Sequence, residues 1–161
     1  MSELDEQIAL ASKLPLLDAA YGLWRFAENP FRRSGDDAFD YQSPPSRGTV
    51  DVSTPASFAE NAPKVFRRAI ETIKFREENA HQGPAFHWLK RAHPDTGDGE
   101  LQQAIRIAVK FDKDCARFFT YSNKGNYHDV EAAIQLASRE NPGFTEPTLK
   151  SAHQYLAYMM R

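Results

Sequence analysis

The stretch GELQQAIRIAVKFDKDCARFFTY, residues 99–121, carries the clearest structural signal in the chain. Its apolar residues recur every three or four positions, the spacing of one face of an α-helix. These residues are Leu101, Ile105, Ala108, Phe111, Cys115 and Phe118. The pattern predicts a long amphipathic helix at the centre of the fold, and Asp98 is placed to cap its N-terminus.

Helical spacing continues on both sides of this stretch, and prolines and glycines separate the segments. The segments with helical spacing cover about residues 4–14, 16–27, 63–81, 84–92, 130–137 and 149–160. In the third of them we expect one face to point into the core, formed by Phe66, Ala69, Ile70, Ile73 and Ala80. A chain of 161 residues has the usual length of one domain. The prediction is an all-α, single-domain bundle of five to seven helices over residues 1–161.

Residues 29–57 interrupt the helical pattern with clustered Ser, Gly and Pro, which predicts one long irregular loop. The loop contains Phe31, Phe39 and Tyr41, and Arg32 and Arg33 are close by. Aromatic residues and arginine contribute much of the binding energy at protein interfaces. We therefore expect these five residues to bind a partner; that the aromatic residues pack the loop onto the bundle is an open alternative.

Charge and cysteine content exclude several classes of protein. The formal charge of -2 and pI near 6.2 mean that a nucleic acid would need a local basic patch. Lys64, Arg67, Arg68, Lys74 and Arg76 are the candidates, and acidic residues between them favour a basic partner-binding or solvated face instead. The single cysteine excludes an intrachain disulfide and a cysteine-based zinc cluster. Because Cys115 lies on the apolar stripe, we expect a buried thiol.

The first residues are acidic, and no apolar run reaches the 18 or so residues that cross a bilayer. The sequence therefore predicts a cytoplasmic protein without a membrane segment. The chain has more large apolar surface than one small core needs, contributed by Trp24, Trp88, Tyr155, Tyr158, Met159 and Met160. This surplus is compatible with a homodimer.

Two short patterns near residue 80 suggest chemistry. Arg76 and His81 have the Arg-x4-His spacing that resembles the catalytic motif of HEPN ribonucleases, which are small helical bundles. The resemblance implies metal-independent RNA cleavage by this pair across a dimer interface. Glu78 and His81 have the Glu-x-x-His spacing with which ferritin-like bundles bind metal, but such a site needs a second copy of that spacing. The chain has no second copy.

Taken together, these patterns favour a non-catalytic helical module that binds another protein, as a regulator, adaptor or small subunit, without a cofactor. Two alternatives stay open at this point. The first is a HEPN-like ribonuclease with Arg76 and His81 as catalytic residues. The second is a ferritin-like bundle with Glu78 and His81 as metal ligands.

Overall fold

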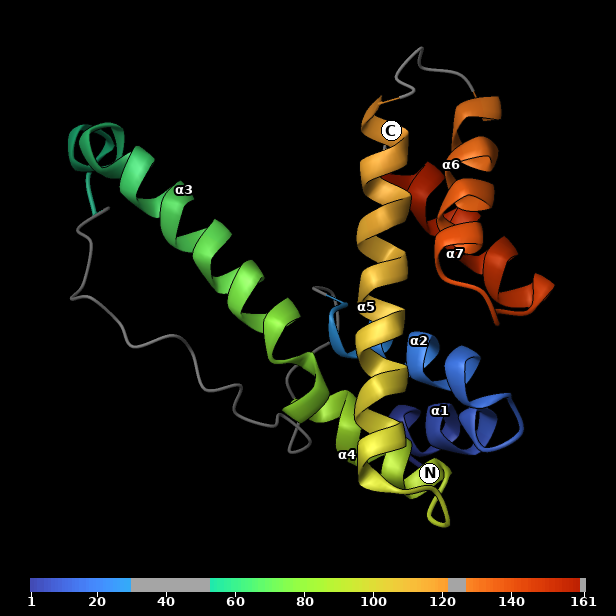
Figure 1. Ribbon diagram of the computed structural model, residues 1–161. Helices are drawn as coiled ribbons and strands as arrows, with labels where there is room; N and C mark the ends of the chain where they lie inside the picture. Colours follow the sequence, from blue (N-terminus) through green and yellow to red (C-terminus); the bar gives the residue numbers. More distant parts are fainter. Residues whose placement is uncertain (30–52, 122–126, 160–161) are drawn as a thin grey trace. The chain divides into compact units, whose positions relative to one another are not determined.

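The computed structural model describes residues 1–29, 53–121 and 127–159. Their regular secondary structure consists of seven α-helices and one 3₁₀ helix (Figure 1), so the predicted all-α fold class is confirmed for these residues. Internal contacts group the chain into two compact units, Met1–Arg33 with Ala80–Arg161, and Ser34–Asn79. The expectation of a single domain over 1–161 stays a prediction, and each unit is described by itself.

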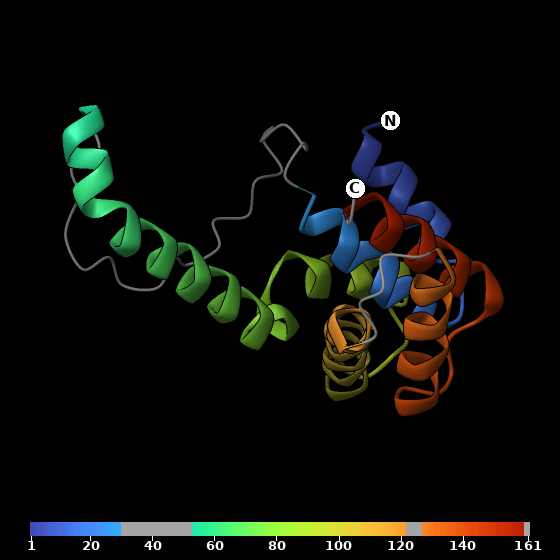
Figure 2. The same ribbon diagram turned by 90° about the horizontal axis from the view of Figure 1, so that it is seen from above.

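The first unit is built around α5 (Asp98–Tyr121), the helix that residues 99–121 predict. Within this unit α5 contacts α2, α4, α6, α7 and the 3₁₀ helix η1, and Figures 1 and 2 show α6 running beside it. The other elements of the unit are α1 (Glu3–Ala11), α2 (Leu16–Ala27), η1 (Ala80–Gln82), α4 (Pro84–Ala92), α6 (Tyr127–Glu140) and α7 (Glu146–Met159). The central position of α5 is therefore confirmed.

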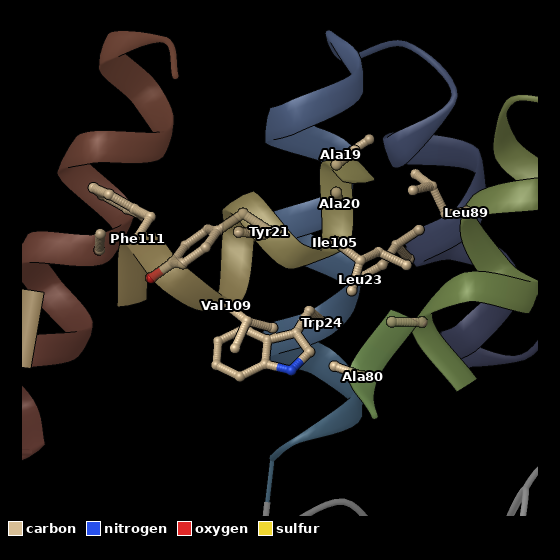
Figure 3. Packing of buried hydrophobic residues seen from close by; sticks show 14 of the residues in the cluster. Ala19, Ala20, Tyr21, Leu23, Trp24, Ala80, Leu89, Ile105, Val109 and Phe111 are labelled. Carbon is tan, nitrogen blue, oxygen red and sulfur yellow. The ribbon is translucent and has the colours of Figure 1, made fainter. Parts of the chain in front are cut away.

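The apolar stripe of α5 lies in the core of this unit. Leu101, Ile105, Ala108, Phe111 and Cys115 are buried, and Phe118 is partly buried. Figure 3 shows Phe111 and Tyr21 on the same side of the cluster, where their ring centroids are 5.4 Å apart with an interplanar angle of 71°. Edge-to-face contacts of this kind add about 0.5–1.5 kcal/mol to the free energy of burial. The ring pair thus ties α5 to α2.

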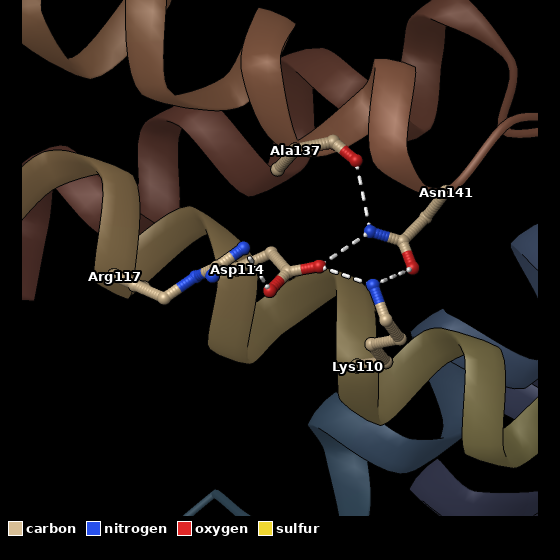
Figure 4. A network of polar contacts seen from close by, with 5 residues as sticks. All are labelled: Lys110, Asp114, Arg117, Ala137 and Asn141. Carbon is tan, nitrogen blue, oxygen red and sulfur yellow. Dashed lines mark hydrogen bonds and ion pairs between the residues drawn. The ribbon is translucent and has the colours of Figure 1, made fainter.

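Two buried carboxylates connect segments that are distant in sequence. Asp114 of α5 accepts hydrogen bonds from Lys110 Nζ at 2.6 Å and from Asn141 Nδ2 at 2.9 Å (Figure 4). Asp18 of α2 accepts hydrogen bonds from the backbone N–H and the hydroxyl of Thr145, both at 3.0 Å. Buried carboxylates need such donors, because an unpaired buried charge is costly. Together these contacts fix the turn between α6 and α7.

The described residues of the second unit form one helix, α3 (Pro55–Glu78). Thr54 caps its N-terminus through a capping box with Ser57, and Pro55 occupies the first turn. The predicted start at Pro63 is therefore wrong, as is the predicted end of the long loop at residue 57. Pro63 lies inside the helix, which changes direction in its N-terminal part (Figure 2). Proline removes one backbone hydrogen bond and bends a helix without necessarily ending it.

No helix in residues 1–29, 53–121 or 127–159 is both long enough and apolar enough to span a bilayer.

Candidate functional site

The most unusual surface of the described structure is an apolar stripe on α3. Phe66, Ile70 and Ile73 are 64%, 65% and 57% exposed, whereas the sequence pattern led us to expect them in the core. That expectation is wrong. Amphipathic spacing shows that one face of a helix favours an apolar neighbour, but it does not identify that neighbour. Three large apolar side chains in contact with water are a candidate interaction site.

The positions of these residues place them on one line along the helix. Ile70 follows Phe66 by four positions and Ile73 follows Phe66 by seven. With 3.6 residues per turn, side chains at this spacing lie one above another on one face. The same spacing is used by amphipathic helices that insert an apolar face into a groove of another protein. We call these three residues the α3 stripe.

Basic residues border the α3 stripe. Arg67 and Lys74 are three and four positions from Ile70, and Arg76 is three positions from Ile73, so each lies about 60° or less from a stripe residue around the helix. Residues 64–78 contain five basic residues, Lys64, Arg67, Arg68, Lys74 and Arg76, and three acidic residues, Glu71, Glu77 and Glu78, which gives a net formal charge of +2. The sequence singled out this basic set as a possible partner-binding face but did not connect it with the stripe.

The residues predicted for the alternative chemistries belong to different elements. Arg76 and Glu78 lie in α3, which ends at Glu78, and His81 lies in η1. Glu78 and His81 therefore do not share one continuous helix, which the Glu-x-x-His spacing needs to place two side chains on one face, and Arg76 and His81 lie in different elements as well. Among the described residues, no group of three or more His, Cys, Asp or Glu side chains could hold a metal ion. The ribonuclease and metal-binding hypotheses remain predictions.

Cys115 is 3% exposed, within the core of the first unit. Burial raises the pKa of its thiol well above the ordinary value, and the negative charges of Asp112 and Asp114 raise it further. A nucleophilic cysteine needs the opposite environment, with positive charge or a helix N-terminus that stabilises the thiolate. The surroundings of Cys115 therefore disfavour the thiolate form.

The five residues that the sequence favoured for partner binding, Phe31, Arg32, Arg33, Phe39 and Tyr41, lie outside the described residues. Of the residues considered for a homodimer, Trp24 and Trp88 are buried, whereas Tyr158 and Met159 are 62% and 57% exposed. Of these residues, Tyr158 and Met159 offer apolar surface to a partner and the two tryptophans do not.

Comparisons with protein-family models, with curated proteins and with solved structures found no match.

Proposed function

We propose that this chain is a non-catalytic protein-interaction module and that α3 is the element that contacts the partner. The observation that carries the proposal is the exposure of Phe66, Ile70 and Ile73, each more than half accessible to water. Burying one such side chain in a groove contributes about 1.5–3 kcal/mol, so three of them supply a substantial part of the affinity of a specific complex. The occupied groove must be apolar along its floor.

The charges around the α3 stripe indicate the rim of that groove. Arg67 and Lys74 along one edge of the stripe and Arg76 along the other favour a partner whose groove is bordered by Asp and Glu. A second copy of α3 is a poorer match. In an antiparallel pair, the edges that carry Arg67 and Lys74 would face each other, and like charges across an interface are destabilising. The partner is therefore a different protein with an acidic-rimmed apolar groove.

A photo-crosslinking amino acid at position 70 tests this contact in cells. The matched control is the same amino acid at position 71, because Glu71 lies about 100° away around the helix. We expect position 70 to give a discrete crosslinked partner that position 71 does not give. Mass spectrometry then identifies that partner, which is purified and combined with the full chain for calorimetry.

In the purified complex we expect Ile70→Asp to weaken binding by about 2 kcal/mol or more, as for a central interface residue. Leu10→Asp serves as a control, because Leu10 on α1 is also a large exposed apolar residue, at 56% exposure. Arg67→Glu should weaken binding most at low salt, since salt screens exposed charges. Equal crosslinking at positions 70 and 71, a crosslink to a second copy, or unchanged affinity of Ile70→Asp would overturn the proposal.

A further inference from the structure

A pocket of about 570 Å³ opens between α1, α2 and α7 in the first unit. Its volume is within the range of about 300–1,000 Å³ that is typical of small-molecule sites. Four aromatic residues contribute to its lining, Tyr21, Phe26, Tyr155 and Tyr158, and Met159 adds a polarizable side chain. The walls therefore suit a flat, apolar ligand. This pocket is separate from the α3 stripe and does not depend on the proposed interaction.

Arg25 is the one charged residue among those that line the pocket. Its guanidinium lies 3.3 Å from the ring centroid of Tyr155 and 5.4 Å from that of Trp24, so aromatic rings hold it in place. Its side chain is 17% exposed. A stacked guanidinium keeps its N–H groups available, because they lie in its own plane and not toward its faces.

The N–H groups of Arg25 make no hydrogen bond to any residue that the structure describes. The carboxylate that pairs with Arg25 is that of Asp112, whose Oδ2 lies 3.6 Å from Nη1, too far for a hydrogen bond. Asp112 Oδ1 instead accepts a hydrogen bond from the hydroxyl of Tyr21 at 3.4 Å. A largely buried guanidinium with unused donors is a ready site for an anion, and a carboxylate can accept two of its N–H groups at once.

The nearby Asp112 also limits the charge of the ligand. Because its carboxylate offsets part of the positive charge of Arg25, and no second cation lines the pocket, a monoanion fits better than a doubly charged phosphate. We propose that this pocket binds a small aromatic carboxylate, with the carboxylate on Arg25 and the ring between Tyr155, Phe26 and Tyr158.

Gly22 leaves room for a side chain at the wall of the pocket. It lies within α2 and lines the pocket, and no atom of the described residues is within 4 Å of the position that a Cβ would occupy. Glycine within a helix is unfavourable relative to alanine, so nothing in the helix itself calls for glycine here. A larger side chain at this position would extend into the pocket without a steric clash in the empty protein.

The test uses the full chain and three probes that distinguish the contribution of the aromatic ring to binding from that of the negative charge. The probes are 2-naphthoate, its uncharged amide 2-naphthamide, and the non-aromatic anion cyclohexanecarboxylate. Calorimetry and saturation-transfer NMR measure binding. We expect 2-naphthoate to bind. The two other probes should bind at least about tenfold more weakly, because the amide lacks the charge for Arg25 and cyclohexanecarboxylate lacks the aromatic ring. Equal binding of all three probes, or no binding of 2-naphthoate at millimolar concentration, overturns the proposal.

Two variants then place the ligand. Arg25→Met should reduce the affinity for 2-naphthoate about tenfold, and Gly22→Leu should abolish binding by filling the pocket while the helical circular dichroism signal persists. Gly22→Leu keeps the test decisive if Arg25→Met fails to fold. Arg117→Met is the matched control, because Arg117 also lies over an aromatic ring, Phe118, and pairs with a carboxylate, Asp114, but does not line the pocket. If 2-naphthoate still binds to Gly22→Leu but not to Ile70→Asp, the probe binds at the α3 stripe, and the proposal for the pocket is wrong.

Discussion

Two glycines show how the same substitution has opposite effects at different positions. Gly22 lies in α2 with open space at its Cβ position, whereas Gly143 has a φ of 113° and an added Cβ would lie 2.8 Å from Leu17 Cδ1. We expect Gly22→Ala to raise the free energy of unfolding by about 0.5–1 kcal/mol. Gly143→Ala should lower it by about 1–2 kcal/mol, because side chains other than glycine are strained in that backbone conformation.

Urea denaturation followed by circular dichroism measures both changes. Equal effects of the two substitutions would mean that Gly22 is not in a regular helix or that Gly143 is not in the left-handed region.

Asp114 makes the stability of the first unit depend on pH. Burial alone would raise the pKa of this carboxyl, but hydrogen bonds from Lys110 and Asn141 and the charges of Lys110 and Arg117 outweigh burial, so its pKa is lowered below 3.8. A group with a lowered pKa in the folded state stabilises the protein above its ordinary pKa, and this stabilisation is lost as pH falls through the folded value. Asp114→Asn should therefore cost about 1–3 kcal/mol near pH 6.

The same denaturation experiment at several pH values checks the sign. We expect the difference between wild type and Asp114→Asn to shrink as the pH is lowered from 4 toward 2, because both side chains are then uncharged. A difference that stays constant across this range would show that the charge of Asp114 does not contribute.

The sequence could predict whether a single residue is buried only where its neighbours in the same helix carry the evidence. Leu101, Ile105 and Phe111 are found in the core because their spacing repeats along one helix. The partners of Asp114 and Asp18 could not be predicted in the same way. Asn141 is 27 positions from Asp114, and Thr145 is 127 positions from Asp18, so only the packed fold shows which donor each carboxylate meets.

At the scale of the helix, α3 contains two prolines with different roles. Pro55 lies in the first turn, where its missing N–H would be unpaired in any case, whereas Pro63 interrupts the hydrogen bonds of the helix interior. We expect Pro63→Ala to stabilise α3 by up to about 3 kcal/mol and to slow amide hydrogen exchange in residues 60–68. Pro55→Ala, as the matched control, should leave this exchange nearly unchanged. Similar behaviour of the two variants would contradict the helix bounds.

The sequence predicted α3 as a helix but misplaced its start and its exposed face. The predicted helix began near Pro63, yet Thr54 and Pro55 carry the stronger signal for a helix start, a capping side chain followed by proline. Periodicity identified Phe66, Ile70 and Ile73 as one face but could not show that the face stays exposed. That outcome depends on which other elements reach the helix.

For the first unit as a whole, α5 holds five other elements together, so damage to its centre should unfold the unit in one step. Phe111 is 0% exposed and its ring meets those of Tyr21 and Phe144, with the Phe144 centroid 4.5 Å away. We expect Phe111→Ala to cost about 3–5 kcal/mol, a large part of the total stability of about 5–15 kcal/mol of a typical domain. Thermal unfolding followed by circular dichroism measures the loss.

Leu136→Ala is the control for this experiment, because Leu136 on α6 is 40% exposed and its truncation should cost much less. A similar loss in both variants would show that Phe111 is not at the centre of the core.

The pocket shows why whole-molecule features are the hardest to predict from sequence. Its residues come from α1, α2 and α7, and Arg25 and Tyr155 are 130 positions apart in the chain. No motif joins them, and each looks like an ordinary surface or core residue in its own helix. The nearest signal in the sequence was the surplus of C-terminal aromatic residues, which we interpreted as a possible homodimer surface.

The burial of Cys115 gives the protein a built-in reporter of how often its core opens. Because the only thiol of the chain is in the core with a raised pKa, a thiol-specific reagent can label it only when the first unit opens. The labelling rate of Cys115 therefore reports the rate or frequency at which the core opens, and no engineered dye is needed. A cysteine introduced on the surface would react at once, so it could carry a spectroscopic tag while the native thiol stays unlabelled.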